Sequence, residues 1–259
     1  MGASPPFGTR VVPIRNRGRP AGYVAVLATA LGAIALLAPA FGGTPRDEYR
    51  SVLAMTPDRI HGQTLFGNCV RCHRANGNGS ADGTIPAIAG QHIRVLAREL
   101  VDFRHDKRWD ARMEHFADTP YVMTTQDVAD IVAYVNSLPV TGPAVTGDGE
   151  QVQHGAEQYA RRCAACHGPQ AEGNPIKGYP RLAAQHYPYL LRQLHDAVEG
   201  RRPNFPASHV RLMSPLNRDD FVGISDFLSR LPPDASRALS AVGRGKRPLG
   251  SVATPVRSQ

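Results

Sequence analysis

The stretch Cys69-Val-Arg-Cys72-His73 returns 94 residues later as Cys163-Ala-Ala-Cys166-His167. These two five-residue units contain all four cysteines of the 259-residue chain. The cysteines therefore belong to one motif that occurs twice.

Both units match the pattern C-x-x-C-H, which is the attachment motif for c-type haem. Two cysteines at this spacing lie on one helical turn, where both thiols can add to the vinyl groups of one porphyrin. The imidazole of the next residue can then bind the iron as the proximal ligand. The sequence predicts two covalently bound haem c groups, attached through Cys69, Cys72, Cys163 and Cys166, with His73 and His167 as proximal iron ligands.

An internal repeat extends beyond the two motifs. Pro86 and Pro180 each lie 14 residues after the second cysteine of their motif, and Gln91-His92 matches Gln185-His186. A structural zinc site made from two C-x-x-C pairs would leave this repeat unexplained. We therefore expect two copies of one small domain, at residues 50–139 and 151–232, joined by a Gly- and Pro-rich linker at residues 140–150.

Each copy is predicted to be all-α, in the order helix, haem loop, helix, loop, helix. Apolar residues recur at helical spacing after His92 and after His186. The last helix of the first copy starts at Thr124-Thr-Gln-Asp127, which resembles a capping box, and the last helix of the second copy starts at Asn217. Domains of about 85 residues are small for a self-sufficient core, and a covalently fixed haem would supply the missing apolar centre.

The N-terminal region predicts export from the cytoplasm. Residues 1–20 contain four arginines and no acidic residue, so they are expected to be disordered and to stay on the cytoplasmic side. Residues 21–41 are apolar and long enough to cross a bilayer, which favours a retained anchor. Their end, Ala38-Pro39-Ala40, favours a cleaved signal peptide instead. Either outcome places the remaining chain outside the cytoplasm.

The formal charge of +8 is concentrated at the two ends of the chain. Residues 46–233 contain 21 basic and 21 acidic side chains, so the expected folded part is neutral. This balance argues against a nucleic-acid partner. Residues 233–259 are basic and rich in Pro, Gly and Ser, and they are expected to form a disordered tail.

Over about residues 50–232 the chain resembles the two-haem class I cytochromes c, of the cytochrome c-four kind. The resemblance rests on both C-x-x-C-H units, on Gly77-Asn-Gly79, on Pro86-Ala-Ile-Ala-Gly-Gln-His92 with Pro180-Arg-Leu-Ala-Ala-Gln-His186, and on Ala133-Tyr134. It implies two tandem class I domains, each with a few helices around one haem, and single-electron transfer in the periplasm.

The resemblance also implies roles for residues near the haems. The carbonyls of Pro86 and Pro180 would accept a hydrogen bond from the proximal imidazoles and fix their tautomer. Arg74 stands where the family usually has glycine, with no functional consequence expected, whereas Gly168 keeps the glycine. The first and last helices of each domain would cross through a small residue against an aromatic one, in the pairs Gly62 with Tyr134 and Gly155 with Phe227.

The distal iron ligands depart from the family pattern, which places a methionine about seven residues before the leucine that introduces the last helix. In the second copy that leucine is Leu216, and seven residues before it stands His209, with Met213 as the alternative. In the first copy Met113 would serve if the loop has three extra residues, with His115 as the alternative. The other repeated histidines, His92 and His186, are expected at helix surfaces or against haem propionates.

Together these features predict a single-electron carrier and no enzymatic activity of its own. Its expected partners are a dehydrogenase or quinol-oxidising donor and a terminal oxidase or other acceptor, with the inner membrane as a further partner through residues 21–41. One alternative is the electron-accepting subunit of a dehydrogenase complex. A less favoured one is a two-haem peroxidase, which would need an open distal site on one haem.

Overall fold

The computed structural model describes residues 43–118, 120–141 and 144–233. Over these residues the chain consists of helices and loops, with one isolated bridge between Asn174 and Tyr179. The all-α prediction is therefore confirmed. The predicted segments 1–20 and 21–41, and the tail after residue 233, lie outside the described residues. In the part that is described, no helix combines the length and the apolar character needed to span a bilayer.

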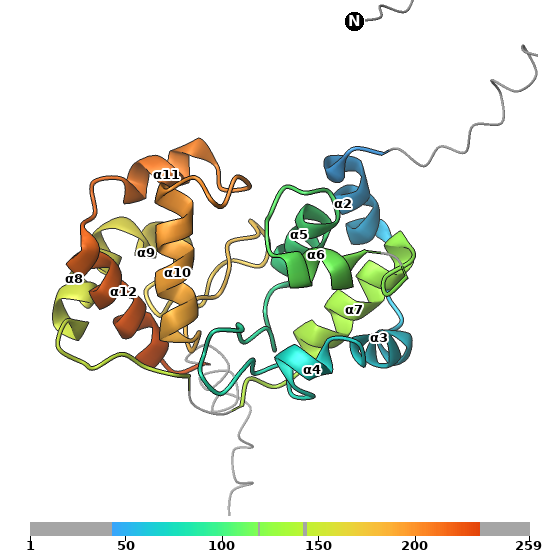
Figure 1. Ribbon diagram of the computed structural model, residues 1–259, viewed down its shortest axis with the longest axis horizontal. Coiled ribbons are helices and arrows are strands. Elements are labelled where there is room, and N and C mark those ends of the chain that lie inside the picture. Colours follow the sequence, from blue (N-terminus) through green and yellow to red (C-terminus); the bar gives the residue numbers. More distant parts are fainter. Residues whose placement is uncertain (1–42, 119, 142–143, 234–259) are drawn as a thin grey trace, which may run out of the picture. The chain divides into compact units, whose positions relative to one another are not determined.

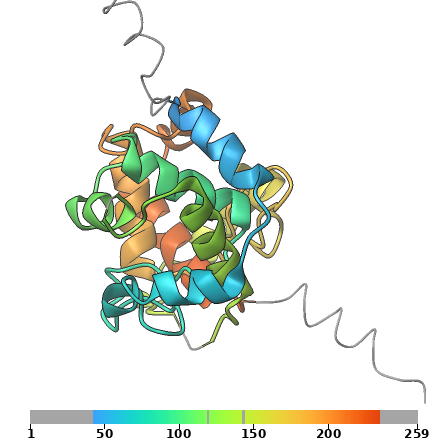
Figure 2. The ribbon, with the colours of Figure 1, turned by 90° about the vertical axis from the view of Figure 1, so that its right-hand side faces the viewer.

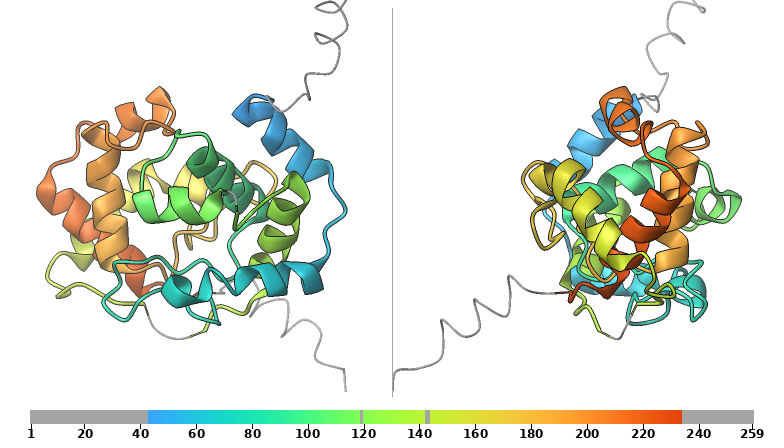
Figure 3. Two further views of the ribbon diagram at one scale, coloured as in Figure 1. Left: turned by 45° about the vertical axis from the view of Figure 1, so that its right-hand side comes forward. Right: turned by 90° about the vertical axis from the view of Figure 1, so that its left-hand side faces the viewer.

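The helices form two sets that follow each other along the chain (Figure 1). The first set comprises α2 (Pro45–Ala54), α3 (Arg59–Phe66), α4 (Val70–His73), α5 (Ile93–Arg104), α6 (Ala111–Ala117) and α7 (Thr125–Ser137). The second set comprises α8 (Val152–Arg162), α9 (Ala164–His167), α10 (Tyr187–Val198), α11 (Ala207–Met213) and α12 (Arg218–Arg230). We call them domain 1 and domain 2, and the turned views separate them by colour (Figures 2 and 3).

The two domains repeat the same helix order, so that α3 to α7 correspond to α8 to α12. The short helices α6 and α11 fall in the loops before the last helices, where no helix was expected. Helix α2 precedes the repeated part of the chain and starts before residue 50, where the first domain was predicted to begin. The domain boundaries expected from the sequence, at residues 50–139 and 151–232, stay a prediction.

The last helix of each domain starts with a complete capping box. The side chain of Thr124 accepts from the backbone N–H of Asp127, and the Asp127 carboxylate accepts from the backbone of Thr124. Asn217 and Asp220 repeat this arrangement at the start of α12. Such reciprocal bonds satisfy two N–H groups that a helix start leaves without intrahelical partners. Both helices end just before a proline, at residues 139 and 232.

The first and last helices of each repeat cross at glycines. A Cβ atom on Gly62 of α3 would overlap the carbonyl of Asp130 in α7, and a Cβ atom on Gly155 of α8 would overlap the carbonyl of Gly223 in α12. Only a residue without a side chain allows two helix backbones to approach this closely. The aromatic residues implied by the resemblance flank the crossings, with Tyr134 5.4 Å from Phe66 and Phe227 5.5 Å from Tyr159 between ring centroids.

Each domain has its own apolar core, and each core contacts the first cysteine of its haem motif. In domain 1 the buried residues Phe66, Val101 and Val128 belong to a cluster that Cys69 packs against. In domain 2 the cluster includes Tyr159, Leu190 and Ile224, and Cys163 packs against it. The two haem motifs are therefore anchored to the cores of their own domains.

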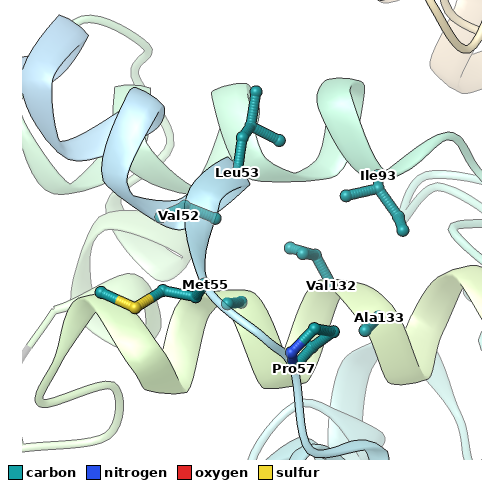
Figure 4. Close-up of a pocket in the computed structure, with 8 residues that line it drawn as sticks. Val52, Leu53, Met55, Pro57, Ile93, Val132 and Ala133 are labelled. Carbon is teal, nitrogen blue, oxygen red and sulfur yellow. The ribbon is translucent and has the colours of Figure 1, made fainter.

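Helix α2 lies over α5 and α7 in domain 1 and leaves an apolar pocket beneath it (Figure 4). Its walls include Val52 and Leu53 from α2, Ile93 from α5 and Val132 from α7. All eight lining residues are apolar, so this pocket contains no acid, base or nucleophile that could act on a substrate.

Candidate functional site

The two C-x-x-C-H units occupy matching single-turn helices. Cys69 precedes α4, which contains Cys72 and His73, and the same arrangement holds for Cys163 before α9. Burial raises the pKa of Cys69 to about 11 and that of Cys163 to about 11 as well. These thiols are therefore protonated at neutral pH, unlike the depressed-pKa thiolates of redox-active C-x-x-C pairs.

Both motif histidines are buried and held by the proline that follows the motif. The Nδ1–H of His73 donates to the Pro86 carbonyl at 3.1 Å, and the Nδ1–H of His167 donates to the Pro180 carbonyl at 3.0 Å. A carbonyl can only accept, so Nδ1 carries the proton and Nε2 keeps its lone pair. Burial lowers the pKa of both imidazoles, which therefore stay neutral and able to bind a metal ion.

The residue after each motif has a backbone conformation that favours glycine. Arg74 has φ of 61° and ψ of 162°, and Gly168 has φ of 82° and ψ of 158°. For a residue with a Cβ atom this conformation costs about 1 to 3 kcal/mol. The arginine in domain 1 therefore stores backbone strain that its glycine counterpart avoids.

Replacing Arg74 with glycine is expected to stabilise the protein by about 1 kcal/mol, because relief of the strain exceeds the added entropy of the unfolded chain. Thermal unfolding of the haem-loaded protein measures this change. The variant Arg71→Ala removes a nearby positive charge without altering a strained position, and it should leave the stability nearly unchanged. An Arg74→Gly variant no more stable than the wild type would show that the conformation costs nothing here.

In domain 2, His209 faces the motif histidine. The rings of His209 and His167 have centroids 6.2 Å apart and planes inclined by 39°. His209 is the third residue of α11, and its ring also packs against Phe205 at 4.8 Å. Burial, with smaller contributions from His167 and Arg202, lowers the pKa of His209 to about 4. Two imidazoles with lowered pKa values thus lie with their ring centroids 6.2 Å apart.

The alternative ligand in this domain, Met213, lies at the end of the same helix with 4% of its surface exposed. It belongs to an apolar cluster with Ala197 and Phe221, separate from the cluster that contacts Cys163. Its thioether therefore fills the core between α10, α11 and α12.

In domain 1, Met113 is the third residue of α6, the same position that His209 has in α11. Met113 is half-buried, and the nearby charges of Arg112 and Asp110 act on the pKa of His73, so the start of α6 lies close to that histidine. His115 is exposed, and its ring contacts Phe116 and Tyr121 at centroid distances of 5.1 and 5.0 Å.

Two glutamines join the domains through reciprocal hydrogen bonds. The amide of Gln185 in domain 2 accepts from the N–H of Ala87 at 3.0 Å and donates to the carbonyl of Ala87 at 2.7 Å. The amide of Gln91 in domain 1 makes the same pair of bonds to Arg181, at 3.0 and 2.9 Å. The sequence repeat had singled out both glutamines, but it did not indicate that each one binds the other domain.

The neighbouring histidines follow the same reciprocal pattern. The Nε2–H of His92 donates to the carbonyl of Glu172 at 2.9 Å, and the Nε2–H of His186 donates to the carbonyl of Asn78 at 2.7 Å. The Nδ1 of His186 accepts from the N–H of Val145 in the segment between the domains. With 4% of its surface exposed, His186 is an interface residue, in contrast to the helix-surface position expected from the sequence.

A partly buried charged cluster completes the contact between the domains. Arg108 of domain 1 and Arg202 of domain 2 both bind the carboxylate of Glu99, at 2.6 and 2.8 Å. Arg108 also donates to Tyr189 and Gln193 across the contact. Burial acts to raise the pKa of Glu99, but the two guanidinium charges outweigh it and hold that pKa at about 2. The carboxylate is therefore ionised, and it bridges two arginines that stand 94 residues apart.

The groups in each domain fit a covalently attached haem. Each offers a pair of thiols on one turn of chain and a buried neutral imidazole with a free Nε2. In domain 2 a second imidazole, that of His209, lies with its ring centroid 6.2 Å from that of His167. Two thiols that can attach a porphyrin and a neutral imidazole that can bind its iron are what a c-type haem requires of the chain.

Comparisons with known proteins agree with this assignment. The cytochrome c family model matches residues 60–139 and again residues 152–231. Cytochrome c4 of Pseudomonas aeruginosa is 30% identical over 182 residues, which cover 67% of this chain and 89% of that protein. The thiosulfate dehydrogenase electron acceptor of Stutzerimonas stutzeri is 29% identical over 189 residues, covering 66% of this chain and 86% of that protein.

A solved structure shares the fold. The crystal structure of reduced recombinant cytochrome c4 from Pseudomonas stutzeri matches with a TM-score of 0.61 and 27% sequence identity. The match covers 68% of this chain and 100% of that chain. The two-domain architecture is therefore shared over the matched part of this chain.

Proposed function

Because the chain belongs to the cytochrome c family, we propose that it passes single electrons between redox proteins on the periplasmic side of a bacterial inner membrane. Like its cytochrome c4 relatives, it is a two-haem electron carrier and not an enzyme. Its cofactors are two covalently bound haem c groups, whose irons supply the reversible one-electron chemistry. The observation that carries the proposal is the pair of C-x-x-C-H motifs, each with a buried histidine held by a proline carbonyl.

The residues of this chain would hold the haems in a defined way. Cys69 and Cys72 in one domain, and Cys163 and Cys166 in the other, attach the porphyrins. His73 and His167 bind the irons through Nε2, while Pro86 and Pro180 fix the rings through Nδ1. Such a bond to the far side of a ligating imidazole orients the ring and increases its basicity.

For the second haem we propose His209 as the distal ligand. Two imidazoles that bind opposite faces of one metal ion, with each nitrogen ~2 Å from it, have ring centres ~6 Å apart. The 6.2 Å between the centroids of His167 and His209 agrees with this arrangement. The ring centroid of Tyr179 lies at a similar distance of 6.3 Å from that of His167. Tyr179 directly precedes Pro180, whose carbonyl accepts from the Nδ1–H of His167. We therefore do not propose Tyr179 as the ligand on the Nε2 side. The burial of Met213 in a separate apolar cluster disfavours that alternative.

For the first haem we propose Met113 as the distal ligand. Its position in α6 corresponds to that of His209 in α11, and the start of α6 lies close to His73. The exposure of His115 and its contacts with Phe116 and Tyr121 disfavour that alternative. Methionine ligation raises the reduction potential relative to a second histidine. The domain 2 haem would therefore have the lower potential, and electrons would collect on domain 1.

We propose partners for the carrier from its one-electron haem chemistry and from the described role of one relative. The Stutzerimonas stutzeri relative is described as an electron acceptor of thiosulfate dehydrogenase. A soluble or membrane-bound dehydrogenase is accordingly the donor that we propose, and a terminal oxidase or another cytochrome is the acceptor. A second candidate function is a permanent electron-accepting subunit of such a dehydrogenase. Purification from the native host separates the two, because a permanent subunit would remain bound to the dehydrogenase.

An optical redox titration of the haem-loaded protein, with and without carbon monoxide, tests the proposed function. Both haems should cycle reversibly, in two one-electron steps, and the reduced spectrum should not change with carbon monoxide. Both irons are then six-coordinate, as electron transfer without ligand exchange requires. Ready binding of carbon monoxide by the wild-type protein would instead favour an open distal site and a peroxidase-like enzyme.

A further inference from the structure

We propose that the proximal ligand of each haem is tuned by a glutamine of the other domain, which makes Gln185 a positioning residue for the first haem and Gln91 one for the second. This inference rests on the proposed haem ligation. It concerns a property that neither domain would have alone, namely that each reduction potential depends on the neighbouring domain.

The connection runs through one peptide group in each domain. The carbonyl of Pro86 accepts from His73, and the N–H of Ala87 belongs to the same peptide plane and donates to Oε1 of Gln185. The peptide between Pro180 and Arg181 accepts from His167 and donates to Oε1 of Gln91 in the same manner. Each proximal imidazole is therefore linked to the opposite domain by two hydrogen bonds and one peptide group.

Hydrogen bonds that share a peptide group strengthen one another. When a peptide N–H donates to a good acceptor, its carbonyl oxygen gains negative charge and accepts more strongly. A stronger acceptor at Nδ1 makes the imidazole more basic, so it is a better donor to iron. A better donor favours the oxidised iron, and each glutamine is therefore expected to lower the potential of the haem across the interface.

The glutamines are fixed in the orientation that this requires. Nε2 of Gln185 donates to the carbonyl of Ala87, so the same side chain cannot turn without losing two bonds. Oε1 of Gln185 also accepts from the N–H of His186, and Oε1 of Gln91 also accepts from the N–H of His92. Each side-chain oxygen is thus held by two N–H groups, one from each domain.

The two connections differ in burial, and this predicts an order of effects. Gln185 and Ala87 each have 9% of their surface exposed, whereas Gln91 is half-buried. Electrostatic interactions are stronger where water is excluded. The shift caused by loss of Gln185 should exceed the shift caused by loss of Gln91.

The test measures both potentials in the full haem-loaded chain, by following haem methyl signals in NMR spectra during a redox titration. The signals are assigned to each domain through contacts with Cys72 or Cys166. Gln185→Leu should raise the potential of the haem in domain 1 and leave the other unchanged. Gln91→Leu should raise the potential of the haem in domain 2 by a smaller amount. The signal of the His73 ring Nδ1–H should shift in the first variant alone.

Two further variants separate tuning from a loosened interface. Tyr189→Phe removes the bond from Arg108 across the domain contact without changing charge, and it should leave both potentials unchanged. Gln185→Glu keeps the acceptor for the N–H of Ala87 and should hold the potential of the first haem at or below the wild-type value.

A shift confined to the haem of the substituted domain would overturn the inference, as would equal shifts of both haems or no shift in either leucine variant. Failure of the proposed haem attachment or proximal ligation shows up separately, because the wild-type protein would then carry fewer than two haems per chain or lack iron-shifted ring signals from His73 and His167 before any titration.

Discussion

Replacing His209 with glycine is expected to create a binding site for one molecule of carbon monoxide per chain, whereas the wild-type protein is expected to bind none. The reason is that His209 is the proposed distal ligand, and its ring centroid lies 6.2 Å from that of His167, close to the separation of two imidazoles on one metal ion. Without it the iron of domain 2 is left with one open coordination position. The reduced spectrum of this haem should change from low-spin to high-spin, and carbon monoxide should then bind with a stoichiometry of one.

Two controls make this result specific to His209. Added imidazole should enter the space left by the side chain, restore the low-spin spectrum and compete with carbon monoxide. Met213→Leu, which keeps the apolar volume, should leave the ligation unchanged, because the side chain lies in the cluster with Ala197 and Phe221. If Met213→Leu opened the haem and His209→Gly did not, the methionine would be the ligand.

Replacing Gly155 with alanine is expected to destabilise domain 2 by about 3 kcal/mol or more, because overpacking against a rigid neighbour commonly costs 1–3 kcal/mol and here the neighbour is backbone. The added Cβ would overlap the carbonyl group of Gly223, so α8 and α12 would have to separate. The gain in helix propensity from glycine to alanine, at most ~1 kcal/mol, does not offset this cost.

Chemical unfolding of the haem-loaded protein, followed by circular dichroism, measures the loss. Gln153→Ala changes an exposed residue of the same helix and should alter stability by less than about 0.5 kcal/mol. Gly62→Ala places the same overlap at α3 and α7 and should destabilise domain 1 in parallel. A Gly155→Ala variant as stable as the Gln153→Ala control would mean that the helices can move apart freely.

The residues that bind the haems directly were largely accessible to sequence analysis, because their chemistry depends on local spacing. A C-x-x-C-H unit fixes three groups within five residues, and the proline that follows each unit recurs at a constant distance. The crossing glycines Gly62 and Gly155 were indicated by the family resemblance, and the structure places both against the backbone of the last helix.

Other features depend on contacts that local spacing does not encode. The spacing before Leu216 indicated His209 but could not separate it from Met213, because the difference lies in which side chain is covered by α10 and α12. The strain at Arg74 depends on a backbone angle, so the substitution looked neutral. The partners of Gln91 and Gln185 lie in the opposite domain, and a repeat reveals two similar domains without showing which surfaces they present to each other.

The reciprocal bonds of these glutamines have a consequence for the history of the chain. Each glutamine contact from one domain is repeated by the equivalent glutamine of the other, which is the self-complementary pattern of a symmetric homodimer. A single-domain ancestor with the same glutamine could have paired with its own copy before the gene was duplicated. Fusion would then have replaced a concentration-dependent association by an intramolecular one. After fusion, the two domains could acquire different distal iron ligands, provided that each kept the glutamine that binds the other domain.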